Sequence, residues 1–467
     1  MTIDSGWLHA FKEEVPEAFG ARPSFIPNAV FVDGQIRLMQ RGLRDDESCT
    51  WEDFICRQFV RPLSRFLDTC DTVILAFDNY EKVPNAKSMT QLQRRRHTPV
   101  VEFRSAWRIL ASACCACPTH AVSARSEMCA LPCVVPRGQE WVGCIANRTF
   151  KTRVIELVLL RLPSLLLKER PGKRLIIDYH QPISYESATE WAPLLHMATM
   201  GEADVKFVRY TEDFPKLLVD SIDGDSVPIA LLHHERKLRA QECPGRVSIC
   251  RIKIKLEPDA GAKRKAESEA KQGKGERARP APREHEYVDI QLLYQALRAA
   301  ALQSSGRVRA PAHEGHEMAM LVALIGLTGT DFSRGLPQVS GKSVYNMLPS
   351  LWPSLLAVYD PPSGQLRVDE AVNILVAKVY SEKFAKHCPA SKKGGLAGVL
   401  ASLKASSLGA RVKDSIPSPA RVECTLQNAN WVLQYWTCAA TYPNPISPQF
   451  GFKMHKGRPT YADVAPA

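Results

Sequence analysis

The chain has 467 residues, 45% of them hydrophobic, so it can bury a sizeable core, and its length suggests two or three folded units. Lys and Arg number 61 against 49 Asp and Glu, and the net charge of +12 favours a polyanionic partner, nucleic acid before a membrane surface. No apolar run approaches the roughly 20 residues that span a bilayer, and the first residues lack a basic stretch followed by an apolar one. Without such a signal, the 14 cysteines are expected to be reduced thiols. We therefore expect an intracellular protein.

Two apolar runs in the first hundred residues each end abruptly in an acid. Residues 29–32 lead into Asp33, and residues 72–77 lead into Asp78. Both runs have the length and composition of buried strands. In open α/β sheets, ligands bind outside the carboxyl ends of the strands, so we expect both acids to face a site and not the core.

A basic stretch, KSMTQLQRRR, follows Asp78. Lys87 and Arg94 are seven residues apart, which is two helical turns, so on one helix they project from the same face. Arg95 and Arg96 add charge beside them. Such a stretch is commonly a solvated basic face, but its position just after Asp78 would let it reach a phosphate held near that acid.

Residues 97–195 contain a Cys-rich segment. One interpretation is a tetrahedral zinc site, and the other is a poorly ordered insertion over residues 105–145. The candidate zinc ligands are Cys114, Cys117, Cys129 and Cys133.

Two regular elements are predicted after this segment. The pattern of residues 148–168 predicts a basic and apolar helix that is broken at Pro163, and the pattern of residues 175–179 predicts another core strand. Asp178 also ends that strand.

Two further pairs of acids follow. Glu202 and Asp204 lie in MGEADVKF, where a helical pattern places both acids at its first turn. In residues 217–232, an apolar run leads into an acidic turn that carries Asp223 and Asp225. Asp-Gly-Asp is also ordinary turn chemistry. Crowded carboxylates repel one another and raise each other's pKa values, so the cluster favours a bound cation such as Mg²⁺ or Mn²⁺.

Residues 255–285 depart from the pattern of a folded domain. Charge, Gly, Ala and Pro dominate the segment, so we expect a disordered basic linker. Its KRK and RAR groups are read as a nuclear import signal, as a non-specific phosphate patch or as simple solvated charge.

A helical pattern returns from residue 286 onward. An apolar run precedes Asp331, and a Gly-rich link with Gly335, Gly341 and Lys342 follows it. Such a link leaves backbone N–H groups free at a helix N-terminus, which suits a phosphate.

The pattern of the last hundred residues predicts basic helices. An aromatic stripe in this part, more typical of a core than of a base-stacking platform, consists of Trp431, Tyr435 and Trp436.

In their order along the chain, these motifs resemble the flap endonucleases and XPG-like 5′ nucleases of the PIN-like superfamily. The resemblance covers about residues 1–100 and 196–350, and the Gly6-Trp7-Leu8 start also fits it. The matching acids are the strand-ending Asp33 and Asp78, the pair Glu202 and Asp204, the pair Asp223 and Asp225, and Asp331 before the Gly-rich hairpin.

The resemblance implies a PIN-like α/β fold with a mostly parallel central sheet flanked by helices, a helix-hairpin-helix-type DNA-binding element and a helical C-terminal region. It implies two Mg²⁺ or Mn²⁺ ions about 4 Å apart. The implied ligands are Asp33, Asp78 and Glu202 for one ion, and Asp223, Asp225 and Asp331 for the other, with Asp204 between. The implied catalytic residues are Lys87 and Arg94, and the implied DNA-binding residues are Arg95, Arg96, Gly335, Gly341 and Lys342, with K⁺ at the hairpin.

The chain departs from the family in several places. The stretch from Asp78 to Lys87 is two residues longer, the hairpin reads Val-Ser-Gly-Lys in place of Ile-Gly-Pro-Lys, and no sliding-clamp motif is recognisable. We expect a nuclear, Mg²⁺-dependent structure-specific endonuclease or 5′ exonuclease that acts on branched DNA or on a free 5′ end in replication, repair or recombination. The alternatives are an inactive nucleic-acid-binding scaffold and a 5′–3′ exonuclease acting on RNA.

The expected domain organisation has six parts. They are an N-terminal nuclease half (1–96), a divergent arch or cap with the Cys-rich insertion (97–195), an internal nuclease half (196–254), the basic linker (255–285), the helix-hairpin-helix-type region (286–350) and a helical C-terminal extension (351–467).

Overall fold

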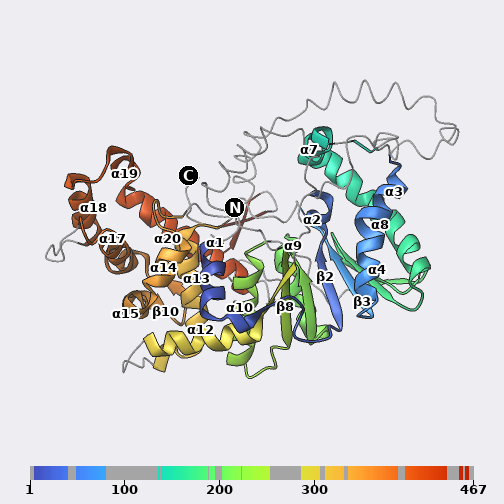
Figure 1. Ribbon diagram of the computed structural model, residues 1–467, viewed down its shortest axis with the longest axis horizontal. Coiled ribbons are helices and arrows are strands. Elements are labelled where there is room, and N and C mark those ends of the chain that lie inside the picture. The colour runs from blue at the N-terminus through green and yellow to red at the C-terminus, as the bar shows by residue number, and fades with distance from the viewer. Residues whose placement is uncertain are drawn as a thin grey trace, which may run out of the picture.

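The structure is a computed structural model that describes residues 5–39, 49–79, 135–136, 138–187, 189–194, 202–221, 223–252, 285–304, 311–330, 335–387, 395–438, 452–455 and 458–461. Within these ranges, a nine-stranded mixed sheet forms the centre of the molecule (Figure 1). The middle strands are parallel and follow the order β8 (Arg246–Ile252), β7 (Lys216–Asp220), β2 (Ala29–Asp33), β3 (Thr72–Ala76) and β4 (Arg174–Asp178). Antiparallel strands close the edges. At one edge β9 (His285–Asp289) pairs with β8 and β1 (Phe19–Gly20) pairs with β9, and at the other edge β5 (Pro182–Tyr185) pairs with β4 and β6 (Trp191–Pro193) pairs with β5. The predicted α/β class with a parallel central sheet is confirmed.

The two faces of the sheet bury alternate residues of the same strands. Phe31 and Ile74 pack into one hydrophobic core, whereas Val30 and Val73 pack into a second core. Successive side chains of a strand point to opposite faces, so a strand covered by helices on both sides needs an apolar residue at every position. This is why the runs before Asp33 and Asp78 are continuous rather than alternating.

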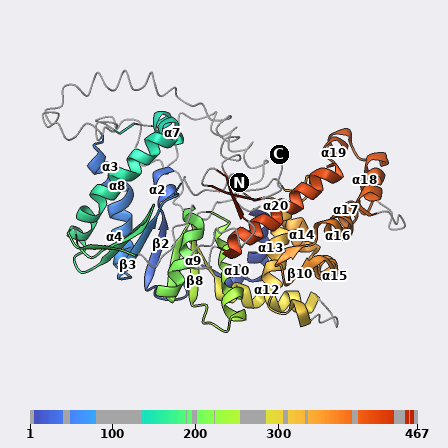
Figure 2. The same ribbon diagram turned by 180° about the vertical axis from the view of Figure 1, so that it is seen from behind.

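Helices cover both faces. The first core includes residues of α1 (Ser5–Glu14), α9 (Ala203–Asp213), α10 (Ser226–Arg239), α12 (Ile290–Ser304) and α13 (Glu317–Thr328). The second core includes residues of α2 (Gly34–Met39), α3 (Trp51–Ile55), the π-helix η2 (Cys56–Val60), α4 (Arg61–Leu67), α7 (Gly138–Ala146) and α8 (Arg148–Glu169). Figures 1 and 2 show α3, α4, α7 and α8 gathered at the end of the sheet that carries β3.

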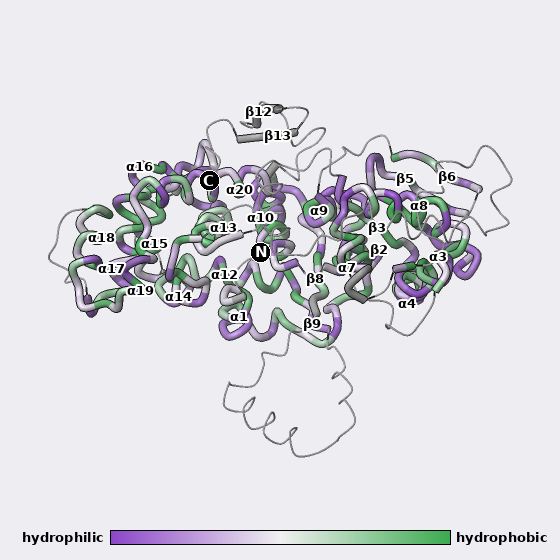
Figure 3. Tube along the Cα trace, turned by 90° about the horizontal axis from the view of Figure 1, so that it is seen from above, coloured by the Kyte–Doolittle hydropathy of each residue, from purple (hydrophilic) through white to green (hydrophobic). Residues whose placement is uncertain are grey.

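The opposite end of the molecule is helical (Figure 2). It is built from α14 (Gly341–Asn346), α15 (Leu348–Val358), α16 (Val368–Ala371), the π-helix η6 (Val372–Val376), α17 (Ala377–Lys383), α18 (Gly395–Ala405), α19 (Ala410–Asp414) and α20 (Pro419–Cys438). The rings of Trp431 and Tyr435 in α20 stack with centroids 5.3 Å apart, and both side chains are buried. The aromatic stripe therefore belongs to the core. Helix α13, which packs against α20, is buried over its length and hydrophobic in Figure 3.

Short elements complete the described chain. They are the 3-10 helices η1 (Pro16–Ala18) and η5 (Pro311–His313), and the two-stranded pairs β10 (Tyr359–Asp360) with β11 (Gln365–Leu366) and β12 (Phe452–His455) with β13 (Arg458–Tyr461). None of the helices in the described ranges is both long enough and apolar enough to span a lipid bilayer.

Two expectations about local structure need correction. Helix α8 runs unbroken through Pro163, which is buried together with Leu162 and Leu166. The free energy gained by packing these side chains outweighs the loss of the backbone hydrogen bond that proline cannot donate. Residues 286–289, where a helix was expected, belong to strand β9, because their backbone pairs with β8. The core strand predicted at residues 175–179 is confirmed as β4, and β5 and β6 continue the sheet beyond it.

Candidate active site

The carboxyl ends of β2 and β3 place two acids at one edge of the sheet. Asp33 is the last residue of β2 and pairs in register with the last residue of β3, so Asp78 lies just beyond the same level on the neighbouring strand. Asp33 is 7% exposed, and its Oδ1 accepts a 2.8 Å hydrogen bond from the backbone N–H of Gln35. A glycine is required at Gly34, because a Cβ there would lie 2.5 Å from the ring of Phe77.

Helix α9 carries a second pair of acids. Glu202 occupies the N-cap position and is fully buried, and Asp204 lies in the first turn and is 7% exposed. The backbone N–H of Ala203 donates a 2.9 Å hydrogen bond to Oδ1 of Asp78. Free N–H groups and the helix dipole favour a carboxylate at a helix N-terminus. Asp78 therefore ties the end of β3 to the start of α9.

The turn between β7 and α10 supplies the third group of acids. Oδ1 of Asp223 accepts a 3.0 Å hydrogen bond from the backbone N–H of Asp225, which is fully buried at the N-cap of α10. Asp220, the first acid of this stretch, forms an ion pair with Arg37 of α2. Asp220 thus links β7 to α2, and Asp223 and Asp225 are the candidate site residues of the turn.

These acids act on one another electrostatically. The pKa of Asp33 is raised well above its usual range, first by burial and then by the negative charges of Asp78, Asp204 and Asp223. The raised pKa of Asp33 does not require the acids to share a metal ion. Coulomb repulsion acts over several ångströms, whereas the ligands of one Mg²⁺ ion lie about 2 Å from it. Among the residues that the structure describes, no three His, Cys, Asp or Glu side chains form a group that could hold a metal ion. The described acids share one edge of the sheet but do not close around a single point.

The donor chemistry nevertheless fits a hard cation. The candidate acids offer carboxylate oxygens as donors, and Asp33, Glu202, Asp204 and Asp225 are each 7% exposed or less. A divalent cation relieves the repulsion between buried carboxylates, and sets of oxygen donors suit Mg²⁺ and Mn²⁺.

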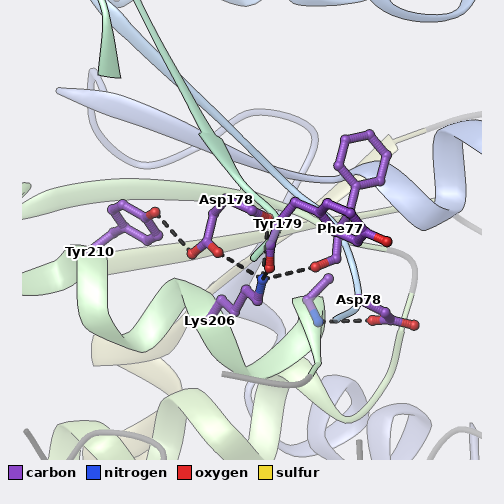
Figure 4. Close-up of polar contacts among 7 residues, drawn as sticks. Phe77, Asp78, Asp178, Tyr179, Lys206 and Tyr210 are labelled. Atoms are coloured by element: carbon purple, nitrogen blue, oxygen red, sulfur yellow. Dashed lines mark hydrogen bonds and ion pairs between the residues drawn. The ribbon is translucent and has the colours of Figure 1, made fainter. Parts of the chain in front are cut away.

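A buried lysine on α9 holds the neighbouring strand ends together (Figure 4). The Lys206 ammonium is 1% exposed and lies 2.7 Å from Oδ1 of Asp178 at the end of β4. It also donates to the backbone carbonyl oxygens of Phe77 at 2.8 Å, Asp178 at 3.2 Å and Tyr179 at 3.1 Å. The hydroxyl of Tyr210 donates a 3.0 Å hydrogen bond to Oδ2 of Asp178. Both carboxylate oxygens of Asp178 are therefore engaged.

Lys206 was not among the site residues predicted from the sequence. Asp178 was predicted only as a strand-ending acid, without a role in the site. A usable signal was present, because Lys206 lies in the acidic helix motif between the apolar residues Val205 and Phe207, and a lysine buried in such a helix requires a charged partner.

Several predicted site residues lie outside the described residues. These are Lys87, Arg94, Arg95, Arg96, Asp331 and the candidate zinc ligands Cys114, Cys117, Cys129 and Cys133, together with most of the predicted linker.

The predicted DNA-binding hairpin is described from Gly335 onward. A Cβ on Gly335 would lie 2.2 Å from backbone atoms of Thr328, and a Cβ on Gly341 would lie 2.3 Å from the Trp7 ring. Both glycines therefore allow close packing, which is a reason for glycine that is independent of phosphate binding. Lys342 forms a 3.0 Å ion pair with Glu13 of α1, and its side chain is 44% exposed.

Comparison with known proteins gives a structural likeness but no match in sequence. No protein-family model and no curated protein sequence matches the chain. Among solved structures, the chain is similar to the catalytic core of Rad2 in complex with DNA substrate, with a TM-score of 0.33 and 14% sequence identity, over 73% of this chain and 68% of that chain. A TM-score this low does not establish which residues correspond, so the interpretation of the site rests on the side chains described above.

Proposed function

We propose that the protein is a metal-dependent nuclease that hydrolyses phosphodiester bonds in branched or flapped DNA. The observation that carries this proposal is the gathering of carboxylates, most of them buried, from β2, the residues just after β3, α9 and the turn before α10 at one edge of a parallel sheet, where charges from the other elements raise the pKa of Asp33. Ligands of α/β proteins bind at this edge. The formal charge of +12 over the whole chain suits a polyanionic substrate.

The acids are proposed as ligands of two divalent ions. When bound, such ions lower the pKa of a water molecule and stabilise charge on the leaving oxygen. The proposed ligands are Asp33, Asp78 and Glu202 for one ion and Asp223, Asp225 and Asp331 for the other, with Asp204 between them.

The basic residues have two proposed roles. Lys87 and Arg94 neutralise charge that develops on the reacting phosphate. Lys342 and the backbone of Gly335 and Gly341 hold a phosphate of the duplex remote from the break. The exposed fraction of Lys342 leaves room for such a contact, but its ion pair with Glu13 must then rearrange.

Cleavage of labelled substrates tests the proposal. The protein is incubated with end-labelled 5′-flap, nicked, gapped and four-way junction DNA in Mg²⁺, and with flap RNA of the same sequence. Asp225→Asn keeps the shape of a fully buried ligand and removes its charge, whereas Glu242→Gln changes an exposed acid that pairs with Lys237. We expect Glu242→Gln to cleave flap DNA as the wild type does and Asp225→Asn to be inactive. DNA binding without cleavage would support a scaffold, and preferential cleavage of RNA would reassign the substrate.

A further inference from the structure

We propose that Lys206 is the positioning residue of the acid cluster, a buried ammonium that fixes α9 against the ends of β3 and β4 and so sets where Asp78, Glu202 and Asp204 can meet a cation. This inference rests on the proposed function, because it concerns the same metal ligands. It assigns no contact between Lys206 and the substrate or the metal.

The contacts of Lys206 meet at the strand ends. An ammonium has three N–H groups, and Lys206 directs them at three backbone carbonyls and one carboxylate oxygen. The residue after Phe77 is Asp78, so the carbonyl that Lys206 holds belongs to the peptide bond that leads into a proposed ligand. The backbone N–H of Phe77 also donates a 2.8 Å hydrogen bond to the carbonyl of Asp178, which joins β3 to β4 at the same level.

The same helix is held at a second point. The hydrogen bond from the N–H of Ala203 to Asp78 fixes the first turn of α9, and Lys206 fixes the next residues of that turn. Glu202 and Asp204 lie between these attachments or directly beside them. Since the acids of this edge repel one another, a helix that carries two of them needs such attachments to stay close.

Lysine suits this position better than other residues. Its compact charge can serve acceptors arranged around one point, whereas the planar guanidinium of arginine presents donors in a fixed fork. Asp178 balances the buried charge, and Tyr210 occupies the second oxygen of that carboxylate. Burial, followed by the charge of Asp178, raises the pKa of Tyr210 well above its usual range, so the hydroxyl keeps the proton that it donates.

A purely structural role is the rival explanation, and three variants separate the two. Lys206→Met leaves Asp178 buried without its counter-charge and can unfold the protein, so Lys206→Met/Asp178→Asn is made as well, because it removes both charges together. Tyr210→Phe removes a single hydrogen bond from Asp178 and keeps the ion pair. Lys237→Met is the matched control, since Lys237 is 7% exposed and pairs with Glu212 near the far end of α9.

Four quantities are measured on the full chain. They are the thermal midpoint of unfolding, the binding of Mn²⁺ without substrate by electron paramagnetic resonance, the Mg²⁺ concentration that gives half-maximal cleavage of flap DNA, and DNA affinity without divalent ions. Changes to residues that orient metal ligands typically weaken metal binding by about 10- to 100-fold. We therefore expect the double variant to fold, to bind Mn²⁺ at least tenfold more weakly and to need correspondingly more Mg²⁺, with unchanged DNA affinity. Tyr210→Phe should shift both metal values in the same direction by a smaller factor, and Lys237→Met should shift neither.

The outcomes distinguish this inference from the proposed function. If the wild type binds Mn²⁺ and cleaves DNA while the folded double variant and Tyr210→Phe keep wild-type metal values, Lys206 is only a structural residue and the inference is overturned. If the double variant does not fold, Tyr210→Phe alone is used: wild-type metal values overturn the inference, and weaker Mn²⁺ binding supports it. If the wild type binds Mn²⁺ without cleaving nucleic acid and the variants bind it more weakly, the positioning role stands and the nuclease proposal fails. If the wild type binds no Mn²⁺, both fail.

Discussion

Replacing Glu235 by Gln should stabilise the protein relative to the wild type as the pH rises from 5 to 8. Glu235 lies on α10, is 1% exposed, and accepts hydrogen bonds from the backbone N–H groups of Met318 at 2.6 Å and Ala319 at 3.0 Å. Burial raises its pKa from 4.5 to about 8, although both N–H groups lower it. The two effects oppose each other, because burial favours the neutral acid and the N-terminus of α13 favours the carboxylate.

The magnitude follows from the difference between the folded and unfolded pKa values. A group with a raised folded pKa contributes stability that is fully present below its unfolded pKa of 4.5 and is lost as the pH rises through about 8. Each pKa unit corresponds to about 1.4 kcal/mol, so ionisation of Glu235 costs the folded state about 5 kcal/mol, most of it between pH 5 and 8. Gln keeps a carbonyl oxygen that can accept one of the two N–H groups and does not ionise.

Urea unfolding at pH 5, 6, 7 and 8 measures this difference. The free energy of unfolding of Glu235→Gln minus that of the wild type should rise with pH by several kcal/mol, on the order of the value above. Glu242→Gln, which removes an exposed acid just beyond the end of α10, should follow the wild type. Parallel curves for the wild type and Glu235→Gln would refute the reasoning and would mean that α13 holds Glu235 as a carboxylate at neutral pH.

Three further predictions concern the site and the hairpin. Asp78→Ala should abolish Mg²⁺-dependent cleavage with DNA binding unchanged or tighter in a gel-shift assay, because one fewer negative charge repels the phosphates; full activity would exclude Asp78 as a ligand. Gly341→Ala should lower the free energy of unfolding by about 1–3 kcal/mol in chemical denaturation, because the added Cβ overlaps the ring of Trp7, and wild-type stability would contradict that packing. Lys87→Ala should slow single-turnover cleavage with little change in DNA affinity. Lys342→Ala should instead weaken duplex binding and reduce the salt dependence of that binding by about one counterion. Identical effects of the two changes would reject their separate roles.

The sequence alone predicted β2, β3, β4 and β7, together with the acids at or just beyond their ends. Continuous apolar runs before Asp33 and Asp78 require burial on both faces, which only a parallel sheet between two helical layers provides. The carboxyl ends of parallel strands lie at one edge, so the two acids had to be neighbours. Local pattern was sufficient here because hydrophobic burial acts on every residue of a strand.

Tertiary structure decided how the surrounding polar residues are used. Asp220 looks like Asp223 and Asp225 in the sequence, yet it pairs with Arg37, which is 183 residues away along the chain. Lys206 meets Asp178 across 28 residues. A single sequence does not reveal such partners, because ion pairs between buried groups depend on which elements pack together and not on local periodicity.

The glycines of the hairpin show the same division. Their presence indicated a turn between helices, and that much follows from backbone freedom. The structure adds that Gly341 faces Trp7, whose ring would lie 2.3 Å from a Cβ at this position. This contact joins residues more than three hundred positions apart, and it exists because α1 packs against α14. Backbone permissiveness is local and can be read from sequence, whereas close approach between helices is a property of the folded chain.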